Sequence, residues 1–267
     1  MVIFTSLVLG DSHTGKTRSL STLPGKSVLF NFDGPDNVTA LRVPFVETNS
    51  LCEFWETKQE IERIVVANYT AEVPGDLSLA ADPMPRKDLV ERFIKDINSL
   101  NIHSEYLMTE ENNGNLIVET VGSLGYSILD YITAYNGKSK IEIQFYDSAM
   151  KKFAAIVGKL MSYGMNVIMT GHIQAEKDEI TGWTRLTPYI WGKKMPETIP
   201  RLFGEVFQTI VTGTGGTIKY QWLTKPTEGS TIGLKFLGTR KIDGLPRIIE
   251  QDFGYLDKLS KEAEQRR

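Results

Sequence analysis

The run Gly10-Asp-Ser-His-Thr-Gly-Lys-Thr17 is the segment of this sequence with the most specific chemistry. It fits the pattern G-x-x-x-x-G-K-[ST], and it lies between a short apolar run, 6–9, and an expected helix from 16 to about 22. Glycines in such a loop let backbone N–H groups turn inward around phosphate oxygens, and the helix start adds the positive end of its dipole. The segment therefore predicts a binding site for a nucleoside triphosphate.

The side chains of this loop have separate expected tasks. Lys16 is expected to reach the β and γ phosphates, and the hydroxyl of Thr17 to bind Mg²⁺. His13 occupies a variable position and is expected to face solvent. The ligands implied are ATP and Mg²⁺, with a ligand-free glycine turn as the alternative. The predicted nucleotide-binding residues are Gly10, Asp11, Ser12, His13, Thr14, Gly15, Lys16, Thr17 and Arg18.

Two acidic residues end buried strands elsewhere in the sequence. Asp33 ends an expected strand at 27–33, and Glu119 ends another at 115–119. A carboxylate at such a strand end faces the phosphates, so one acid is expected to position the metal and the other to orient the attacking water. The run ending at Glu119 has the form of a Walker B strand with Glu where Asp is usual, so Glu119 is a candidate Mg²⁺ ligand, directly or through water. The alternative for both is a solvent-exposed strand end.

A histidine follows the fourth expected strand, at 165–171. His172 stands at its carboxyl end, where a polar side chain can contact the γ-phosphate and respond to its loss. This makes His172 a candidate sensor, with a surface or satisfied core histidine as the alternative. His103 has no partner in the sequence pattern and is interpreted as structural.

Two stretches interleave cations with aromatic residues, a composition that suits stacking and backbone contacts with single-stranded nucleic acid. The first covers 174–194, where acidic residues dilute the charge and an ordinary solvated loop is the alternative. The second and weaker stretch covers 131–146. The nucleic-acid-binding candidates from both are Lys177, Trp183, Arg185, Lys138 and Lys140.

Composition limits the class of protein. The chain has 267 residues, of which 41% are hydrophobic and 24% charged, so a sizeable core is expected and wholesale disorder is not. Its longest apolar runs fall far short of the roughly twenty residues that a membrane-spanning helix needs. No secretory signal is expected, because the amino-terminal run has no basic residue ahead of it. The single cysteine, Cys52, excludes an internal disulfide framework, and a net charge of -3 argues against a generally basic coat.

The elements that position these residues alternate along the first two thirds of the chain. Short buried strands are separated by expected helices at 51–66, 87–100 and 149–163, and a surface connection is expected at 71–85. This alternation predicts a mainly parallel sheet covered on both faces. The last third changes character, because 205–211 and 218–224 flank a glycine-rich turn and predict an antiparallel hairpin. The charged tail, 258–267, is expected to be the frayed end of a helix.

The order of these motifs resembles the RecA-type ATPase core. More closely, it resembles the phage nucleotide-binding proteins of the Sak-four group, short RecA-like proteins linked to single-strand annealing and recombination. The likeness covers most of the chain, although only the phosphate loop is individually specific. The matching segments are the loop at 10–17, Asn-Phe-Asp33-Gly, Leu-Ile-Val-Glu119, Val-Ile-Met-Thr-Gly-His172, Gly192-Lys, 199–207 and 238–246.

The resemblance implies an α/β fold: a RecA-type P-loop NTPase core with a mainly parallel central sheet flanked by helices and a C-terminal antiparallel hairpin extension. It implies one domain over 1–267, with an inserted or extended segment at about 71–113 and the hairpin part at about 200–256. It also implies nucleic-acid loops at about 131–147 and 174–191.

The same resemblance implies roles for particular side chains. Asp33 falls at the position of the general base, Glu119 at the Walker B carboxylate and His172 at the switch or sensor. RecA-like proteins work as rings or filaments in which a basic residue reaches the neighbour's γ-phosphate. The candidates for that trans-acting residue are Lys193, Lys194 and Arg240.

The expected function is that of an ATP-binding and ATP-hydrolysing protein that binds single-stranded DNA in phage recombination, annealing or replication. It is expected in the cytoplasm, as a homo-oligomer, with a single-strand-binding protein or a helicase as a further partner. One alternative is a helicase loader or replication accessory ATPase that acts on a protein. Another is a small-molecule P-loop kinase, although the late hairpin and 238–246 do not resemble the arginine-bearing lid of a kinase.

Overall fold

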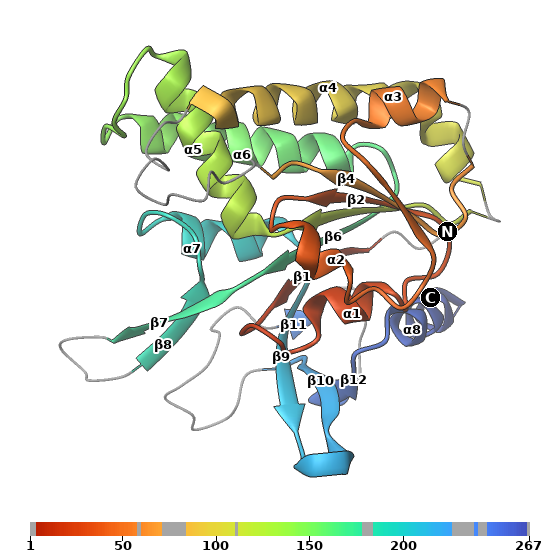
Figure 1. Ribbon diagram of the computed structural model, residues 1–267. Helices are drawn as coiled ribbons and strands as arrows, with labels where there is room; N and C mark the ends of the chain where they lie inside the picture. The colour runs from red at the N-terminus through yellow and green to blue at the C-terminus, as the bar shows by residue number, and fades with distance from the viewer. Residues whose placement is uncertain are drawn as a thin grey trace.

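A large sheet forms the centre of the molecule in the computed structural model, and a two-stranded hairpin, β7–β8, projects from it (Figure 1). The structure describes residues 4–57, 60–70, 84–109, 112–177, 184–225, 238–239 and 245–265. Its strands are β1 (Thr5–Leu9), β2 (Ser27–Asn31), β3 (Phe45–Thr48), β4 (Ile64–Asn68), β5 (Asn115–Glu119), β6 (Asn166–Gly171), β7 (Ile173–Lys177), β8 (Thr184–Pro188), β9 (Glu205–Thr212), β10 (Lys219–Leu223), β11 (Gly238–Thr239) and β12 (Ile248–Glu250). Its α-helices are α1 (Lys16–Leu20), α2 (Pro35–Val38), α3 (Leu51–Glu56), α4 (Met84–Leu107), α5 (Val121–Tyr135), α6 (Phe145–Met161), α7 (Met195–Thr198) and α8 (Phe253–Gln265).

The strand order places the phosphate loop at the centre of the sheet. The order is β12-β10-β9-β1-β6-β5-β2-β4-β3, and every pair from β9 to β3 is parallel. Strands β10 and β12 continue the sheet in antiparallel fashion beyond β9. The residues of β2 and β5 are buried throughout, as expected for strands covered on both faces. This arrangement confirms the predicted RecA-type α/β core with a C-terminal antiparallel hairpin.

Helices cover both faces of the sheet. Helices α3 to α6 lie above it in Figure 1, and α1 and α8 lie below. Side chains alternate between the two faces along each strand, so Leu7 and Leu9 join the cluster under α3 to α6, whereas Val8 joins the cluster with Phe253 of α8. None of the described helices is long and apolar enough to cross a membrane.

The prediction of one helix over 51–66 is wrong. Helix α3 ends at Glu56, and β4 begins at Ile64. The helical spacing arose because three residues enter the same core cluster from different parts of the chain: Phe54 from α3, Ile61 from the connection after it, and Val65 from β4. The β-branched residues of β4 pair in parallel with β2 and β3, and this sheet pairing decides the conformation.

Other predicted elements are present with shifted bounds. Helix α4 is longer than predicted, α6 begins four residues earlier, at Phe145, and β2 ends at Asn31, so Asp33 lies just beyond its strand. The expected hairpin is formed by β9 and β10, with β9 also parallel to β1. The weaker nucleic-acid stretch, 131–146, includes the last residues of α5 and the first of α6, and the residues between Tyr135 and Phe145 form a connection between these helices. The expected connection at 71–85 lies mostly outside the described residues.

Candidate functional site

The phosphate loop turns tightly at the carboxyl end of the central strand. Gly15 precedes α1 with φ +88°, a left-handed conformation that suits glycine. Gly10 lies against β9, where a Cβ would stand 1.6 Å from Thr209 Oγ1, so no side chain fits there. The hydroxyl of Thr14 is 2.5 Å from that of Thr209. The loop is therefore fastened to β9 as well as to its own strand.

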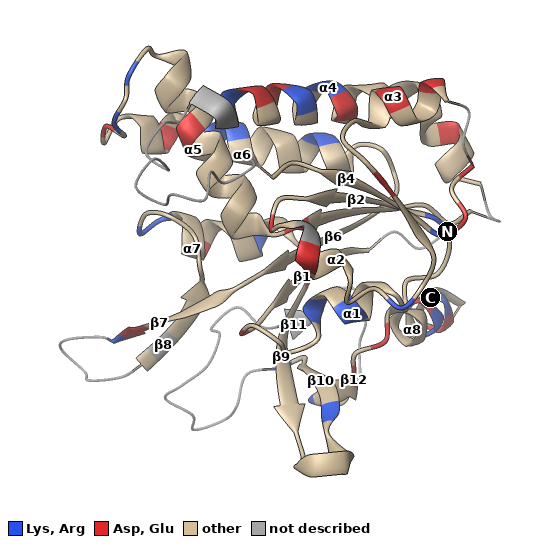
Figure 2. Cartoon of the chain, viewed as in Figure 1, with Lys and Arg blue, Asp and Glu red and all other residues tan. Residues whose placement is uncertain are grey.

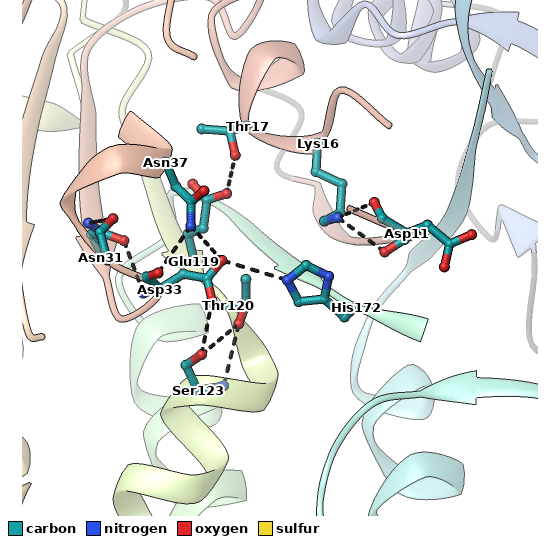
Figure 3. Close-up of polar contacts among 12 residues, drawn as sticks. Asp11, Lys16, Thr17, Asn31, Asp33, Asn37, Glu119, Thr120, Ser123 and His172 are labelled. Atoms are coloured by element: carbon teal, nitrogen blue, oxygen red, sulfur yellow. Dashed lines mark hydrogen bonds and ion pairs between the residues drawn. The ribbon is translucent and has the colours of Figure 1, made fainter. Parts of the chain in front are cut away.

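Lys16 folds back over this loop. Its ammonium donates to the backbone carbonyl oxygens of Gly10, at 3.1 Å, and Asp11, at 2.7 Å (Figure 3). Burial lowers the pKa of Lys16, and the carboxylates of Glu119, Asp33 and Asp11 oppose that shift. Neutral carbonyls are weaker partners for an ammonium than phosphate oxygens are. A nucleotide would offer Lys16 better acceptors at the same place.

Glu119 and Thr17 meet at the end of β5. The Thr17 hydroxyl donates to Glu119 Oε1, while Oε2 is buried without a hydrogen-bond partner in the described part of the chain. Burial raises the pKa of Glu119 to about 7, and the charge of Asp33 adds to the shift, whereas Thr17 and Lys16 oppose it. A hydroxyl beside a partnerless carboxylate oxygen suits Mg²⁺, which prefers oxygen ligands. Thr17 and Glu119 therefore fit the predicted metal.

Asp33 is held in place from several sides (Figure 3). Its Oδ2 accepts a hydrogen bond from Asn37 Nδ2 at 2.8 Å, and its Oδ1 accepts one from Ser123 Oγ at 3.2 Å. His172 Nε2 lies 3.6 Å from Oδ2, and the backbone N–H of Asp33 donates to Asn31 Oδ1. The side chain of Asp33 is 22% exposed, so the carboxylate is both oriented and accessible.

The predicted site residues share one cavity. The structure brings Lys16, Thr17, Asp33, Glu119 and His172 to the walls of a cavity of about 620 Å³. They come from three parallel strand ends and the start of α1, which the strand order places side by side. Ser12, His13, Gly15 and Arg18 also line it, and His13 is exposed as predicted.

A second cavity of about 580 Å³ adjoins the first. Arg18, Arg42 and Tyr220 line both, and the Arg18 guanidinium lies 5.1 Å from the centre of the Tyr220 ring. Gln251 donates to the carbonyl of Thr14 at 2.9 Å, which ties β12 to the phosphate loop. The sequence analysis missed Arg42, Tyr220 and Gln251, because only the antiparallel pairing of β9, β10 and β12 brings the last two to the loop.

The family comparison agrees with this geometry. The sequence profile of a family described as an AAA domain matches residues 4–231. The chain belongs to this family. Among solved structures, this AAA domain is similar to a KaiC-like protein from the hyperthermophilic archaeon Pyrococcus horikoshii OT3, with 11% sequence identity, a TM-score of 0.40, and coverage of 85% of this chain and 80% of that one. No curated protein matches the sequence.

The family match and the phosphate loop together indicate an AAA-type P-loop ATPase domain, for which a nucleotide and Mg²⁺ are the implied ligands. Two residues that orient Asp33, Asn37 and Ser123, were not found by the sequence analysis. The sequence does carry a signal for Ser123. Thr120, directly after Glu119, caps α5 by accepting a hydrogen bond from the Ser123 backbone N–H, and this helix start places Ser123 close to the end of β5. Asn37 lies four residues after Asp33 and reaches back to it from α2.

Among the nucleic-acid candidates whose side chains the structure describes, none lines the cavity of this AAA domain. Lys177 is exposed at the end of β7. Arg185 lies in β8, where its backbone is paired with Glu176 of β7, and the side chain of Arg185 is outside the described part. Trp183 is outside the described residues. Lys138 forms an ion pair with Glu142, with Nζ 3.1 Å from Oε1, and Lys140 is exposed.

The two trans-acting candidates that the structure describes are likewise absent from the cavity walls. Lys193 and Lys194 are exposed on the segment that leads into α7, and they border a different hollow. Arg240 lies outside the described residues. His103, interpreted as structural, stacks on Trp55 with ring centroids 4.5 Å apart.

Proposed function

We propose that this AAA domain hydrolyses ATP with Asp33 as the general base. One observation carries the proposal: the Asp33 carboxylate is fixed by Asn37 and Ser123 in the cavity that also holds Lys16. A base acts only when it is aimed at the proton it removes, and two hydrogen bonds from separate helices give Asp33 that orientation. The water oxygen attacks the γ-phosphorus as its proton passes to Asp33, and the bond from that phosphorus to the β–γ bridging oxygen breaks.

Other residues stabilise the charge that develops on the phosphates. Lys16 exchanges the carbonyls of Gly10 and Asp11 for phosphate oxygens, and the loop N–H groups hold the phosphates. Thr17 and Glu119 hold Mg²⁺, which when bound neutralises the charge on the phosphate oxygens. His172, beside Asp33, responds to the presence of the γ-phosphate. The base and ribose of the nucleotide occupy the adjoining cavity, where Tyr220 offers an aromatic ring.

Asp33→Asn tests the assignment of the base. The amide keeps the shape of the side chain but cannot accept the proton, so ATP turnover should fall about 10²-fold or more. Binding of a fluorescent ATP analogue should stay within about twofold of wild type. Asp36→Asn is the matched control, because Asp36 also lines the cavity but is not joined to Asn37 and Ser123 through its carboxylate. Normal turnover by Asp33→Asn would remove Asp33 from this role and leave Glu119 as the next acid to test.

We propose further that the domain binds single-stranded DNA through the β7–β8 hairpin, in a phage recombination, annealing or replication reaction. The hairpin projects from the sheet immediately after His172 (Figure 1). The backbone N–H of Tyr189, just after β8, donates to the His172 carbonyl at 2.8 Å. A contact between His172 and the γ-phosphate would therefore act at the base of the hairpin, where both of its strands join the sheet. Oligomerisation would place Lys193, Lys194 or Arg240 near a neighbour's nucleotide.

The double variant Trp183→Ala/Arg185→Ala tests the hairpin. Loss of a stacked aromatic and of a phosphate contact should weaken oligonucleotide binding by about tenfold or more and reduce DNA-stimulated turnover, while basal nucleotide binding persists. Anisotropy titrations with and without a non-hydrolysable ATP analogue measure both affinity and coupling. Unchanged DNA affinity would contradict the hairpin assignment. Stimulation by a helicase, with none by DNA, would favour a helicase loader instead.

A further inference from the structure

A second hollow lies outside the nucleotide cavities, between the start of α6 and the segment that leads into α7. Its volume is about 520 Å³, and none of its lining residues lines either nucleotide cavity. Its walls are apolar: Ile143, Tyr146, Met150, Trp191 and Met195. Lys193 and Lys194 at its edge are also trans-acting candidates, but its apolar walls have no part in the proposed hydrolytic mechanism.

The shape of the hollow is fixed without a ligand. Trp191 is only 5% exposed, and its ring packs edge-on against Tyr146 with centroids 5.6 Å apart. On the other side of the wall, Ile190 packs so closely on Gly125 of α5 that a Cβ there would lie 2.5 Å from its Cδ1. A rigid hollow loses little conformational entropy when it takes up a ligand.

Apolar surface at the hollow is left in contact with water. Ile143 is 88% exposed and Ile141 is 43% exposed, both in the short connection between α5 and α6. Burying such side chains is favourable, and contiguous exposed apolar surface marks binding sites. Ile143 at the rim therefore extends the apolar lining of the hollow onto the surface of the described part of the chain.

The charge beside this surface is positive. Lys193 and Lys194 are exposed at the edge of the hollow, and Gly192, with φ +73°, turns the chain just before them. The carboxylate at the edge, Asp147, is already bonded to Lys151 at 2.7 Å. Figure 2 shows the blue positions of this turn beside α7. These two exposed lysines therefore complement an acidic partner.

We propose that this hollow is a docking site for an acidic peptide segment that carries apolar side chains, supplied by a partner protein. The apolar side chains enter the hollow, and the acidic residues contact Lys193 and Lys194. A nucleobase fits less well, because the aromatic walls pack on each other instead of offering a free face, and the apolar walls leave the polar edge of a base without partners. The site shares no lining residue with the nucleotide cavity, so a variant of its apolar wall tests the docking without changing the residues proposed for hydrolysis within one subunit.

Fluorescence anisotropy with a labelled synthetic peptide tests this docking site. The probe has three aspartates followed by leucine and phenylalanine, and its controls replace the aspartates by lysines or the two apolar residues by serines. Wild type should bind the probe at least about tenfold more tightly than either control peptide. Circular dichroism of each protein variant verifies that it is folded.

Two protein variants locate the binding. Ile143→Asp should weaken probe binding about tenfold or more, as should Lys193→Glu/Lys194→Glu. Ile102→Asp and Lys95→Glu, at exposed positions of α4, should stay within about twofold of wild type. These exposed positions leave folding intact, so a negative result is informative.

Three outcomes would overturn the proposal. The first is that the probe does not bind wild type, or that it binds the hollow variants as tightly as it binds wild type. The second is an oligothymidylate that competes with the probe and loses affinity in the same variants, which would assign the hollow to nucleic acid. The third is sedimentation velocity showing a self-association that Ile143→Asp abolishes, which would assign it to a second copy of this chain.

Discussion

The nucleotide cavity and the hollow beside α6 differ in how their lining side chains are partnered within the chain. In the cavity, polar groups are paired with one another: Lys16 with loop carbonyls, Thr17 with Glu119, and Asp33 with Asn37 and Ser123. The hollow is lined mainly by apolar side chains that pack on one another, such as Trp191 on Tyr146, and Ile143 at its rim is left almost fully exposed.

This difference separates two kinds of binding energy. A ligand of the cavity replaces existing hydrogen bonds by stronger, charge-assisted ones, so the net gain depends on geometry and charge. A ligand of the hollow gains from apolar burial with little to displace. Substitutions in the cavity should therefore change turnover or pH dependence, whereas substitution of Ile143 at the exposed rim of the hollow should leave the chain's own stability almost unchanged.

Lys16→Ala should produce the largest change. Removal of the cation that faces the β and γ phosphates should reduce ATP turnover about 10³-fold. A phosphate-release assay measures this, with Lys95→Ala on α4 as the control. Activity near that of wild type would show that the paired cavity is not the hydrolytic site.

Glu119→Gln should change how stability depends on pH. In the ligand-free fold the pKa of Glu119 is raised from 4.5 to about 7, so between these values the folded state holds a proton that the unfolded state has released. The free energy of unfolding of wild type should therefore fall as pH rises through that window. The neutral amide lacks this dependence, so the variant should gain on the order of 3 kcal/mol relative to wild type near pH 8.

Urea unfolding at about pH 5 and about pH 8, in the presence of EDTA, measures that difference. The two proteins should differ little at the lower pH, where the glutamate is mostly protonated in the folded state. Parallel pH curves for the two proteins would mean that Glu119 does not titrate in this window.

Ser123→Ala should have a smaller effect on turnover. Loss of its hydrogen bond lets the Asp33 carboxylate rotate, so kcat should fall about tenfold while KM stays nearly constant. Ser123→Thr keeps the hydroxyl and should recover most of the rate. Ser127→Ala is the control one turn along α5, because its hydroxyl bonds only to the Ser123 carbonyl among the described contacts. Equal rates for the two alanine variants would make Ser123 a structural residue only.

Ile143→Ser should have the smallest effect. The side chain is 88% exposed, so its replacement should change the free energy of unfolding by no more than about 0.5 kcal/mol. Thermal and urea unfolding measure this value. A loss of several kcal/mol would show that the hollow belongs to the core of the chain, and the comparison between the two regions would then fail.

Some features of this protein are determined by local sequence. The phosphate loop could be predicted because its glycines, Lys16 and Thr17 act within one short segment, where backbone conformation and helix start are set by neighbours. The buried strands that end near Asp33, Glu119 and His172 could be predicted from short apolar runs. Parallel pairing then placed these residues at one edge of the sheet.

Other features depend on contacts between distant segments. The second half of the helix predicted at 51–66 includes the start of a strand, because pairing with β2 and β3 outweighs helical spacing. Ser123 reaches Asp33 across 90 residues of sequence, Gln251 reaches Thr14 across 237, and Ile143 meets Trp191 only where α6 packs beside the segment entering α7. Periodicity and motif spacing describe neighbours along the chain, whereas these contacts exist only once the sheet has fixed the strand order.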